Sequence, residues 1–294
     1  MQERIRVDNI SKKYGGRTAL SDVSIAACDG ECLGIYGRSG SGKTALLRVM
    51  AGIDSPDSGS ITPHRAGFSF QMPIFDETLT PAEALYICAT LYGIPPGKRN
   101  SAVRDTLILV GMDSMDDLRI SALSLGYRKL LEVARALITP FDLLLLDDPM
   151  AGLDTDMRVR LWEHLLKLRA HGGKTIILAT SRSEDAEICD RVVLLHEGRV
   201  LADGTVDQLQ SMAASEAVVI TPIAAKGGQQ SKSERTVIVG KEQDGHLIVQ
   251  AGDKLLPADV LRQLQGNAAV RLHTRGLDSI LDELIAAEKD SGDA

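Results

Sequence analysis

The chain has 294 residues, 44% of them hydrophobic and 25% charged, which excludes global disorder and allows one large domain or two smaller ones. Its formal net charge of −7 argues against broad, salt-driven binding to nucleic acid, because no excess of cations is available for phosphates. No apolar run approaches the roughly 20 residues that cross a bilayer, and the N-terminus lacks the hydrophobic stretch of a secretory signal.

Strand and helix patterns alternate along most of the chain. Short apolar runs predict strands near residues 5–10, 32–36, 143–146, 175–179 and 192–195. Helical periodicity follows the glycine-rich sequence after residue 36, and it recurs over about 80–136 and 155–170. This alternation predicts an α/β fold that is interrupted once by a mostly helical insert.

The sequence GRSGSGKT follows the second of these strands and opens a helix, so it fits the phosphate-loop pattern GxxxxGK[ST]. Glycines allow the backbone to wrap closely, so that successive N–H groups and the helix N-terminus face phosphate oxygens. Lys43 is expected to reach the β and γ phosphates, and the Thr44 hydroxyl to bind Mg²⁺. The nucleotide-binding residues are therefore predicted as Gly37, Arg38, Ser39, Gly40, Ser41, Gly42, Lys43 and Thr44.

Two acids, Asp147 and Asp148, follow the apolar run 143–146. A phosphate-loop site needs a carboxylate at the end of a buried strand to hold magnesium, and Asp147 is expected to do this through water. The alternative is that the two acids simply end a strand. The phosphate loop in the same sequence argues against this alternative. The predicted cofactors are ATP and Mg²⁺.

Over about residues 4–210 the chain resembles the nucleotide-binding subunit of ATP-binding cassette (ABC) transporters. The resemblance rests on six motifs in order: KYGG with Tyr14, the phosphate loop, FSFQ with Gln71, LSLGY at 123–127, LLLLDD, and AGLD ending at Asp154. It implies an ATPase with a P-loop NTPase fold, in which a RecA-like core, an antiparallel β subdomain and a helical subdomain at about 72–140 make up residues 1–210.

The resemblance also implies roles for residues outside the phosphate loop. Tyr14 would stack on adenine, and Gln71 would touch the Mg²⁺ shell and sense the site. The signature residues Ser124, Leu125, Gly126 and Tyr127 would contact the ATP of an opposing subunit, next to the D-loop residue Asp154. The plainer alternatives are a strand-end tyrosine, a polar loop glutamine and a serine that only caps its helix.

Two catalytic positions depart from the family pattern. Asp148 stands where the family has its catalytic glutamate, and Ser181 stands where it has its switch histidine. A carboxylate one methylene shorter and a short neutral hydroxyl both weaken hydrolysis, because a misplacement of about 1 Å costs on the order of 10²-fold. Leu125 and Tyr127 also differ from the commonest signature, whereas Ser124 and Gly126 are kept.

The remaining residues predict a smaller second part. Residues 211–235 are small, polar and glycine-containing and read as a linker, 236–288 as a small α+β accessory domain, and 289–294 as a disordered tail. The segments ATLYGIP at 89–95 and RGLDSILDEL at 275–284 resemble the ABC-2 branch, which includes drug and polysaccharide exporters.

The resemblance implies a separate membrane permease as partner, docked near Gln71 and residues 72–80, where Pro73, Ile74 and Phe75 offer an apolar surface. The chain would work at the inner face of the cell membrane as a dimer of two such subunits, with no nucleic acid partner. Two hypotheses stay open: a slow ATPase that drives transport, and a catalytically weak regulatory subunit paired with a competent one.

Overall fold

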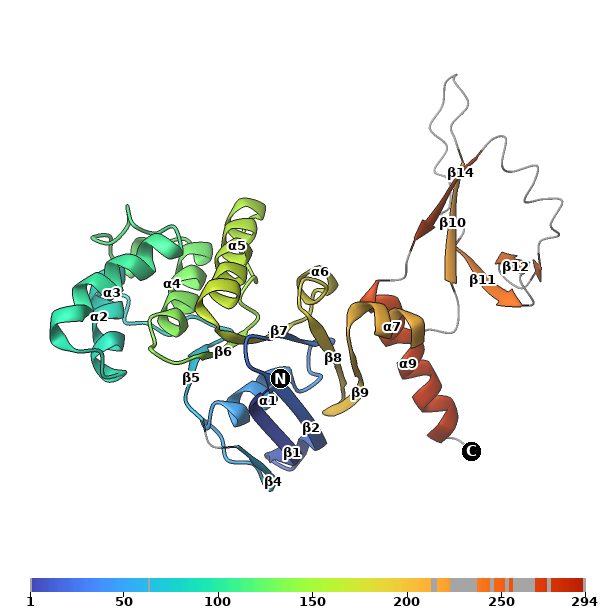
Figure 1. Cartoon of the computed structure of the whole chain (residues 1–294), viewed down its shortest axis with the longest axis horizontal. Coiled ribbons are helices and arrows are strands. Elements are labelled where there is room, and N and C mark those ends of the chain that lie inside the picture. Colours follow the sequence, from blue (N-terminus) through green and yellow to red (C-terminus); the bar gives the residue numbers. More distant parts are fainter. Residues whose placement is uncertain are drawn as a thin grey trace, which may run out of the picture. The chain divides into compact units, whose positions relative to one another are not determined.

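The computed structural model describes residues 2–62, 64–212, 216–222, 237–243, 246–251, 254–255, 268–273 and 276–292. The chain divides into two compact units, Met1–Thr205 and Val206–Ala294 (Figure 1). Among the described residues, no helix is long and apolar enough to cross a bilayer.

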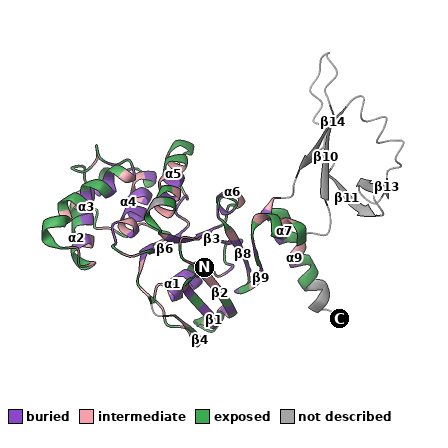
Figure 2. Cartoon of the chain, in the orientation of Figure 1, coloured by how far each residue is buried: buried purple, intermediate pink, exposed green. Residues whose placement is uncertain are grey.

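A six-stranded sheet in the order β5-β6-β7-β3-β8-β9 forms the centre of the first unit. Its strands are β3 (Cys32–Tyr36), β5 (Ala66–Ser69), β6 (Leu143–Asp147), β7 (Thr175–Thr180), β8 (Arg191–His196) and β9 (Arg199–Gly204). All neighbours pair in parallel except β8 and β9. Every residue of β3, β6 and β7 is buried (Figure 2), as expected for parallel strands covered on both faces.

A three-stranded antiparallel sheet in the order β2-β1-β4 adjoins the phosphate loop. It consists of β1 (Glu3–Tyr14), β2 (Arg17–Cys28) and β4 (Ser58–Ile61). Its apolar face and the helix α1 (Lys43–Met50) form a core cluster with β3 and β6. The predicted α/β class with an antiparallel β subdomain is therefore confirmed.

The helical insert lies between β5 and β6 and packs a second apolar core. It contains α2 (Pro81–Leu91), α3 (Pro96–Leu109), the short 3-10 helix η1 (Ile120–Ala122) and α4 (Leu125–Leu137). A capping box between Thr80 and Glu83 and a proline in the first turn begin α2. The helices α5 (Thr155–Gly172) and α6 (Ser183–Ala186) follow β6 and β7.

The second unit contains a five-stranded antiparallel sheet in the order β13-β12-β11-β10-β14. Its elements are α7 (Val206–Met212), β10 (Glu216–Pro222), β11 (Val237–Gln243), β12 (His246–Ala251), β13 (Lys254–Leu255), β14 (Ala268–His273) and α9 (Leu277–Gly292).

The domain bounds differ from the predicted ones in three places. The first unit ends at Thr205 rather than at residue 210. The predicted linker 211–235 contains β10, which pairs with β11 and β14, and its residues 213–215 and 223–235 lie outside the described ones. The predicted tail 289–294 is helical as far as Gly292, because α9 continues through it.

Candidate functional site

The phosphate loop connects β3 to α1 and requires its glycines. Gly40 and Gly42 have φ values of 81° and 107°, in the left-handed region that favours glycine. A Cβ atom on Gly37 would lie 2.2 Å from the Leu195 carbonyl oxygen, and one on Gly42 would lie 2.6 Å from that of Ala19. The loop therefore packs closely against the neighbouring strands, and only glycine fits at these two contacts.

Lys43 extends over its own loop. Its Nζ donates to the carbonyl oxygens of Gly37 at 2.7 Å and Arg38 at 2.9 Å, and burial lowers its pKa below the ordinary value. An ammonium in this position faces the concave side of the loop, where the N–H groups of a phosphate loop bind anions. The geometry suits the predicted phosphate contact of Lys43.

Asp147 ends β6 and is buried beside the start of α1. Burial raises the pKa of its carboxyl above the ordinary value, while a hydrogen bond from the Thr44 side chain opposes that rise. A carboxylate and a hydroxyl on neighbouring elements supply the oxygen ligands that Mg²⁺ prefers. Thr44 and Asp147 are therefore residues that would hold a magnesium ion.

Asp148 adopts a left-handed backbone conformation with φ of 47°, and its N–H donates to the Ala179 carbonyl oxygen at 2.9 Å. Burial raises the pKa of its carboxyl, and the nearby ammonium groups of Lys129 and Lys43 oppose the rise. Within the described part of the chain, its Oδ1 has no hydrogen-bond partner. A buried carboxylate oxygen without a partner suits a group that would meet a water or a ligand.

One cavity of about 320 Å³ brings half of the predicted site residues together. It is lined by Ser39, Gly40, Gly42, Lys43, Thr44, Gln71, Asp147, Asp148 and Ser181. The phosphate loop, the glutamine, both acids and the serine at the histidine position thus border one space, although they come from segments far apart in the sequence.

Four further residues line the same cavity and were not predicted: Arg17, Thr18, Ala19 and Ala45. The pairing of Tyr14 with Arg17 across the β1–β2 turn brings the first three to the site. Gly15 and Gly16, both with positive φ, make that turn. The Gly-Gly pair between two strand patterns was the available signal, because it favours a tight hairpin.

Tyr14 lies at the end of β1, is partly exposed and does not line this cavity. Its hydroxyl donates to Asp54 Oδ2 at 2.5 Å, and Arg48 pairs with the same carboxylate at 2.7 Å. Burial and the hydrogen bond to Asp54 raise the pKa of Tyr14 to about 12. Lys12 Nζ lies 5.5 Å from the ring centroid. The ring is thus fixed by its hydroxyl and stays uncharged.

The signature residues lie at the start of α4, outside the cavity. Ser124 caps the helix, its Oγ accepting from the Tyr127 N–H at 3.4 Å, and Leu125 is 77% exposed. A Cβ atom on Gly126 would lie 3.4 Å from the Gly152 carbonyl oxygen. Gly152 belongs to the D-loop, which ends at Asp154. The Asp154 carboxylate caps α5 by accepting from the Met157 N–H at 2.8 Å. The structure therefore contains the cap that was the plainer alternative for Ser124.

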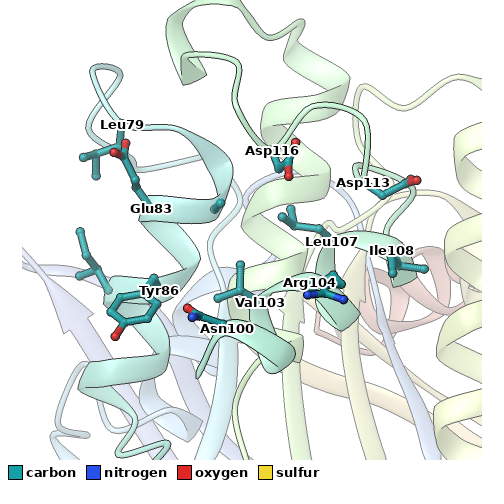
Figure 3. A pocket seen from close by; sticks show the side chains of 12 residues that line it. Leu79, Glu83, Tyr86, Asn100, Val103, Arg104, Leu107, Ile108, Asp113 and Asp116 are labelled. Atoms are coloured by element: carbon teal, nitrogen blue, oxygen red, sulfur yellow. The ribbon is translucent and has the colours of Figure 1, made fainter. Parts of the chain in front are cut away.

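A larger cavity, of about 810 Å³, lies in the helical insert between α2 and α3. Side chains of the two helices border it from opposite sides (Figure 3). Its lining includes three partly exposed side chains, those of Tyr86, Ile87 and Ile108. The lining combines apolar side chains with charged and polar ones, and it contains none of the predicted nucleotide-binding residues.

Comparisons with known proteins show the family of the chain. The profile of the ABC transporter family matches residues 20–151. Nod factor export ATP-binding protein I of Paraburkholderia xenovorans is 34% identical over 255 residues, covering 81% of this chain and 84% of that protein. The protein of the same name from Mesorhizobium japonicum is 32% identical over 284 residues, covering 90% and 81%.

Solved structures share the fold of the first unit. An ATP-binding subunit of an ABC transporter superposes with a TM-score of 0.65 at 26% identity, over 71% of this chain and 92% of that one. A dimeric ATP-binding cassette with bound ADP and phosphate has a TM-score of 0.65 at 24% identity, over 69% and 98%.

Proposed function

The chain belongs to the ATP-binding subunits of ABC transporters, and from this premise we propose that it binds ATP with Mg²⁺ and drives a separate membrane permease as one of two opposed cassettes. The observation that carries the proposal is the cavity in which the phosphate loop, Gln71 and the two acids meet. Calorimetric titration with ATP in the presence and absence of Mg²⁺ tests the nucleotide binding. No heat of ATP binding under either condition would overturn the proposal.

Export is the direction that the relatives favour. Two proteins more than 80% covered by this chain are named for the export of Nod factor, and the segments 89–95 and 275–284 resemble the ABC-2 branch. We infer an exporter whose cargo is chosen by the permease, because no residue of the nucleotide cavity would touch a cargo. The permease would hold the chain at the inner face of the membrane.

Slow hydrolysis is proposed from two side chains of the cavity. Asp148 and Ser181 both line it, at the positions of the family's glutamate and histidine. The Asp148 carboxylate reaches one methylene less far toward an attacking water, and the Ser181 hydroxyl is too short to span to a γ-phosphate. Both changes affect the positioning on which phosphoryl transfer depends, and neither affects the groups that bind the nucleotide.

A regulatory role is the second candidate, favoured by the same pair of substitutions. In a heterodimer, Ser124 would complete the ATP site of a competent partner cassette, while the chain's own site would bind ATP and turn over slowly. The mass of the complex purified from membranes separates the two readings, because a heterodimer contains a second cassette of different mass.

Tyr14→Ala is expected to weaken ATP binding about tenfold, since stacking of a base on an aromatic ring contributes about 1–3 kcal/mol. Tyr14→Phe keeps the ring and loses only the hydrogen bond to Asp54, so its affinity should stay within about threefold of wild type. Titration with a fluorescent ATP analogue measures both. Equal affinities of the alanine variant and the wild type would contradict the stacking role.

Ile74→Asp is expected to reduce the amount of the chain that sediments with membranes containing its permease, about tenfold or more. Ile74 and Met72 are 65% and 71% exposed next to Gln71, and two exposed apolar side chains so close in the chain suit a docking surface. Ile188→Asp is the control, because it places the same charge at another exposed isoleucine. A similar loss in both variants would argue against a specific contact.

A further inference from the structure

Three charged side chains of α4 reach one short segment of the chain, residues 68–74, which carries Gln71. Lys129, Glu132 and Arg135 are spaced by three and therefore lie on neighbouring positions of one helix face. Lys129 is 3% exposed and Glu132 is 0% exposed, whereas charged residues are rarely buried without partners.

Lys129 binds three backbone carbonyl groups. Its Nζ donates to Phe70 O at 3.1 Å, Gln71 O at 2.9 Å and Asp147 O at 3.0 Å. An ammonium has three N–H donors, so all of them are used. Lys129 therefore joins the carbonyl of Gln71 directly to the carbonyl of the residue that we propose as the magnesium ligand.

The Glu132 carboxylate binds backbone N–H groups of the same segment. Its Oε1 accepts from Phe70 N at 2.8 Å, and its Oε2 accepts from Ile74 N at 3.5 Å. Arg135 pairs with Glu132 at an Nε–Oε1 distance of 3.1 Å and donates to Phe68 O, also at 3.1 Å. The segment is thus held on both sides of Gln71 by acceptors and donors from one helix.

Apolar burial does not explain how the later part of this segment, residues 71–74, keeps its place. Phe68 and Phe70 anchor the start of the segment in a core cluster, but Gln71, Met72 and Ile74 are exposed, so the hydrophobic effect contributes little at these later positions. Two buried charges are costly unless their hydrogen bonds are complete, and here backbone groups of 70–74 and 147 complete them. The charges and the segment therefore depend on each other.

We propose that Lys129 and Glu132 are positioning residues of the nucleotide site: they fix Gln71 against Asp147 and tie its segment to the helix that begins at Ser124. This inference rests on the proposed function. It assigns to α4 a mechanical link between the residue that would sense this chain's own nucleotide and the residue that would meet the nucleotide of the opposed subunit.

Hydrogen–deuterium exchange of the full chain tests the link without and with ATP and Mg²⁺. In the nucleotide-free chain, Lys129→Met removes all three donors and is expected to raise amide exchange over 68–76 at least about tenfold. Peptides of α1 should stay within about twofold. Val133→Ala is the matched control, since Val133 is a buried residue of the same helix without a polar contact to the segment.

Lys129→Gln keeps up to two donors and is expected to raise exchange over 68–76 about threefold, so it serves if the methionine variant does not fold. With ATP and Mg²⁺, wild type should gain protection over 37–46, 69–76 and 123–131. The Lys129 variants should keep the gain over 37–46 and lose the gain over 123–131.

Three results would overturn the link: wild-type exchange over 68–76 in the folded Lys129 variants, the same local rise in Val133→Ala, or full ATP protection of 123–131 in the variants. Absence of ATP protection over 37–46 in wild type would instead overturn the proposed function. The nucleotide-free comparison distinguishes these two failures, because it needs no bound ATP.

Discussion

The double substitution Asp148→Glu with Ser181→His is expected to raise the ATP turnover of the purified chain about 10²-fold. Both side chains line the cavity beside Lys43 and Thr44. The added methylene would bring the carboxylate closer to an attacking water, and the imidazole could donate to a γ-phosphate. Because the two groups would act on the same step, each single variant should recover only a small part of the gain. Phosphate release at saturating ATP and Mg²⁺ is the measurement.

A control pair makes the same chemical changes away from the site. Asp142→Glu precedes β6 and Ser211→His lies on α7, and both side chains are exposed. Turnover of this pair should match wild type, and the ATP affinity of the active-site double variant should change little, since the phosphate loop is untouched. A double variant no faster than wild type would remove Asp148 and Ser181 as the cause of slow hydrolysis.

The residues of the nucleotide cavity could be predicted where a local spacing carries the chemistry. The phosphate loop is read from eight consecutive residues, and Asp147 from the end of an apolar run. Arg17 and Thr18 could not be read in this way, because only the pairing of β1 with β2 brings them to the cavity. Gly15 and Gly16 indicate the hairpin between these strands, but nothing in the sequence indicates that the second strand borders the phosphate loop.

Lys129 and Glu132 illustrate the same limit inside a recognised motif. In the sequence they are ordinary charged residues of an amphipathic helix, and such residues normally face solvent. They are buried because β5 and β6 end beside α4 and offer backbone groups to both charges. In the second unit, glycine and small polar residues predict a linker, and the structure adds that β10 within it pairs with β11 and β14, which lie further along the chain.

Lys43→Met is expected to weaken ATP binding about 10²-fold or more. Two unit charges about 4 Å apart interact by about 4 kcal/mol near a protein surface, and without Lys43 the phosphates would face the acids Asp147 and Asp148. The variant also loses the two hydrogen bonds that Nζ donates to the carbonyl oxygens of Gly37 and Arg38, so the loop itself is less well held. Calorimetric titration with ATP measures the loss.

Adenosine separates a lost phosphate contact from a collapsed site. Adenosine has no phosphates, so its weak binding beside Tyr14 should change little in Lys43→Met, whereas binding of ATP falls. Lys167→Met removes the same charge from the exposed surface of α5 and should leave both ligands unaffected. Equal losses for adenosine and ATP would mean that Lys43 acts by holding the loop, because only a direct contact with phosphate discriminates between the two ligands.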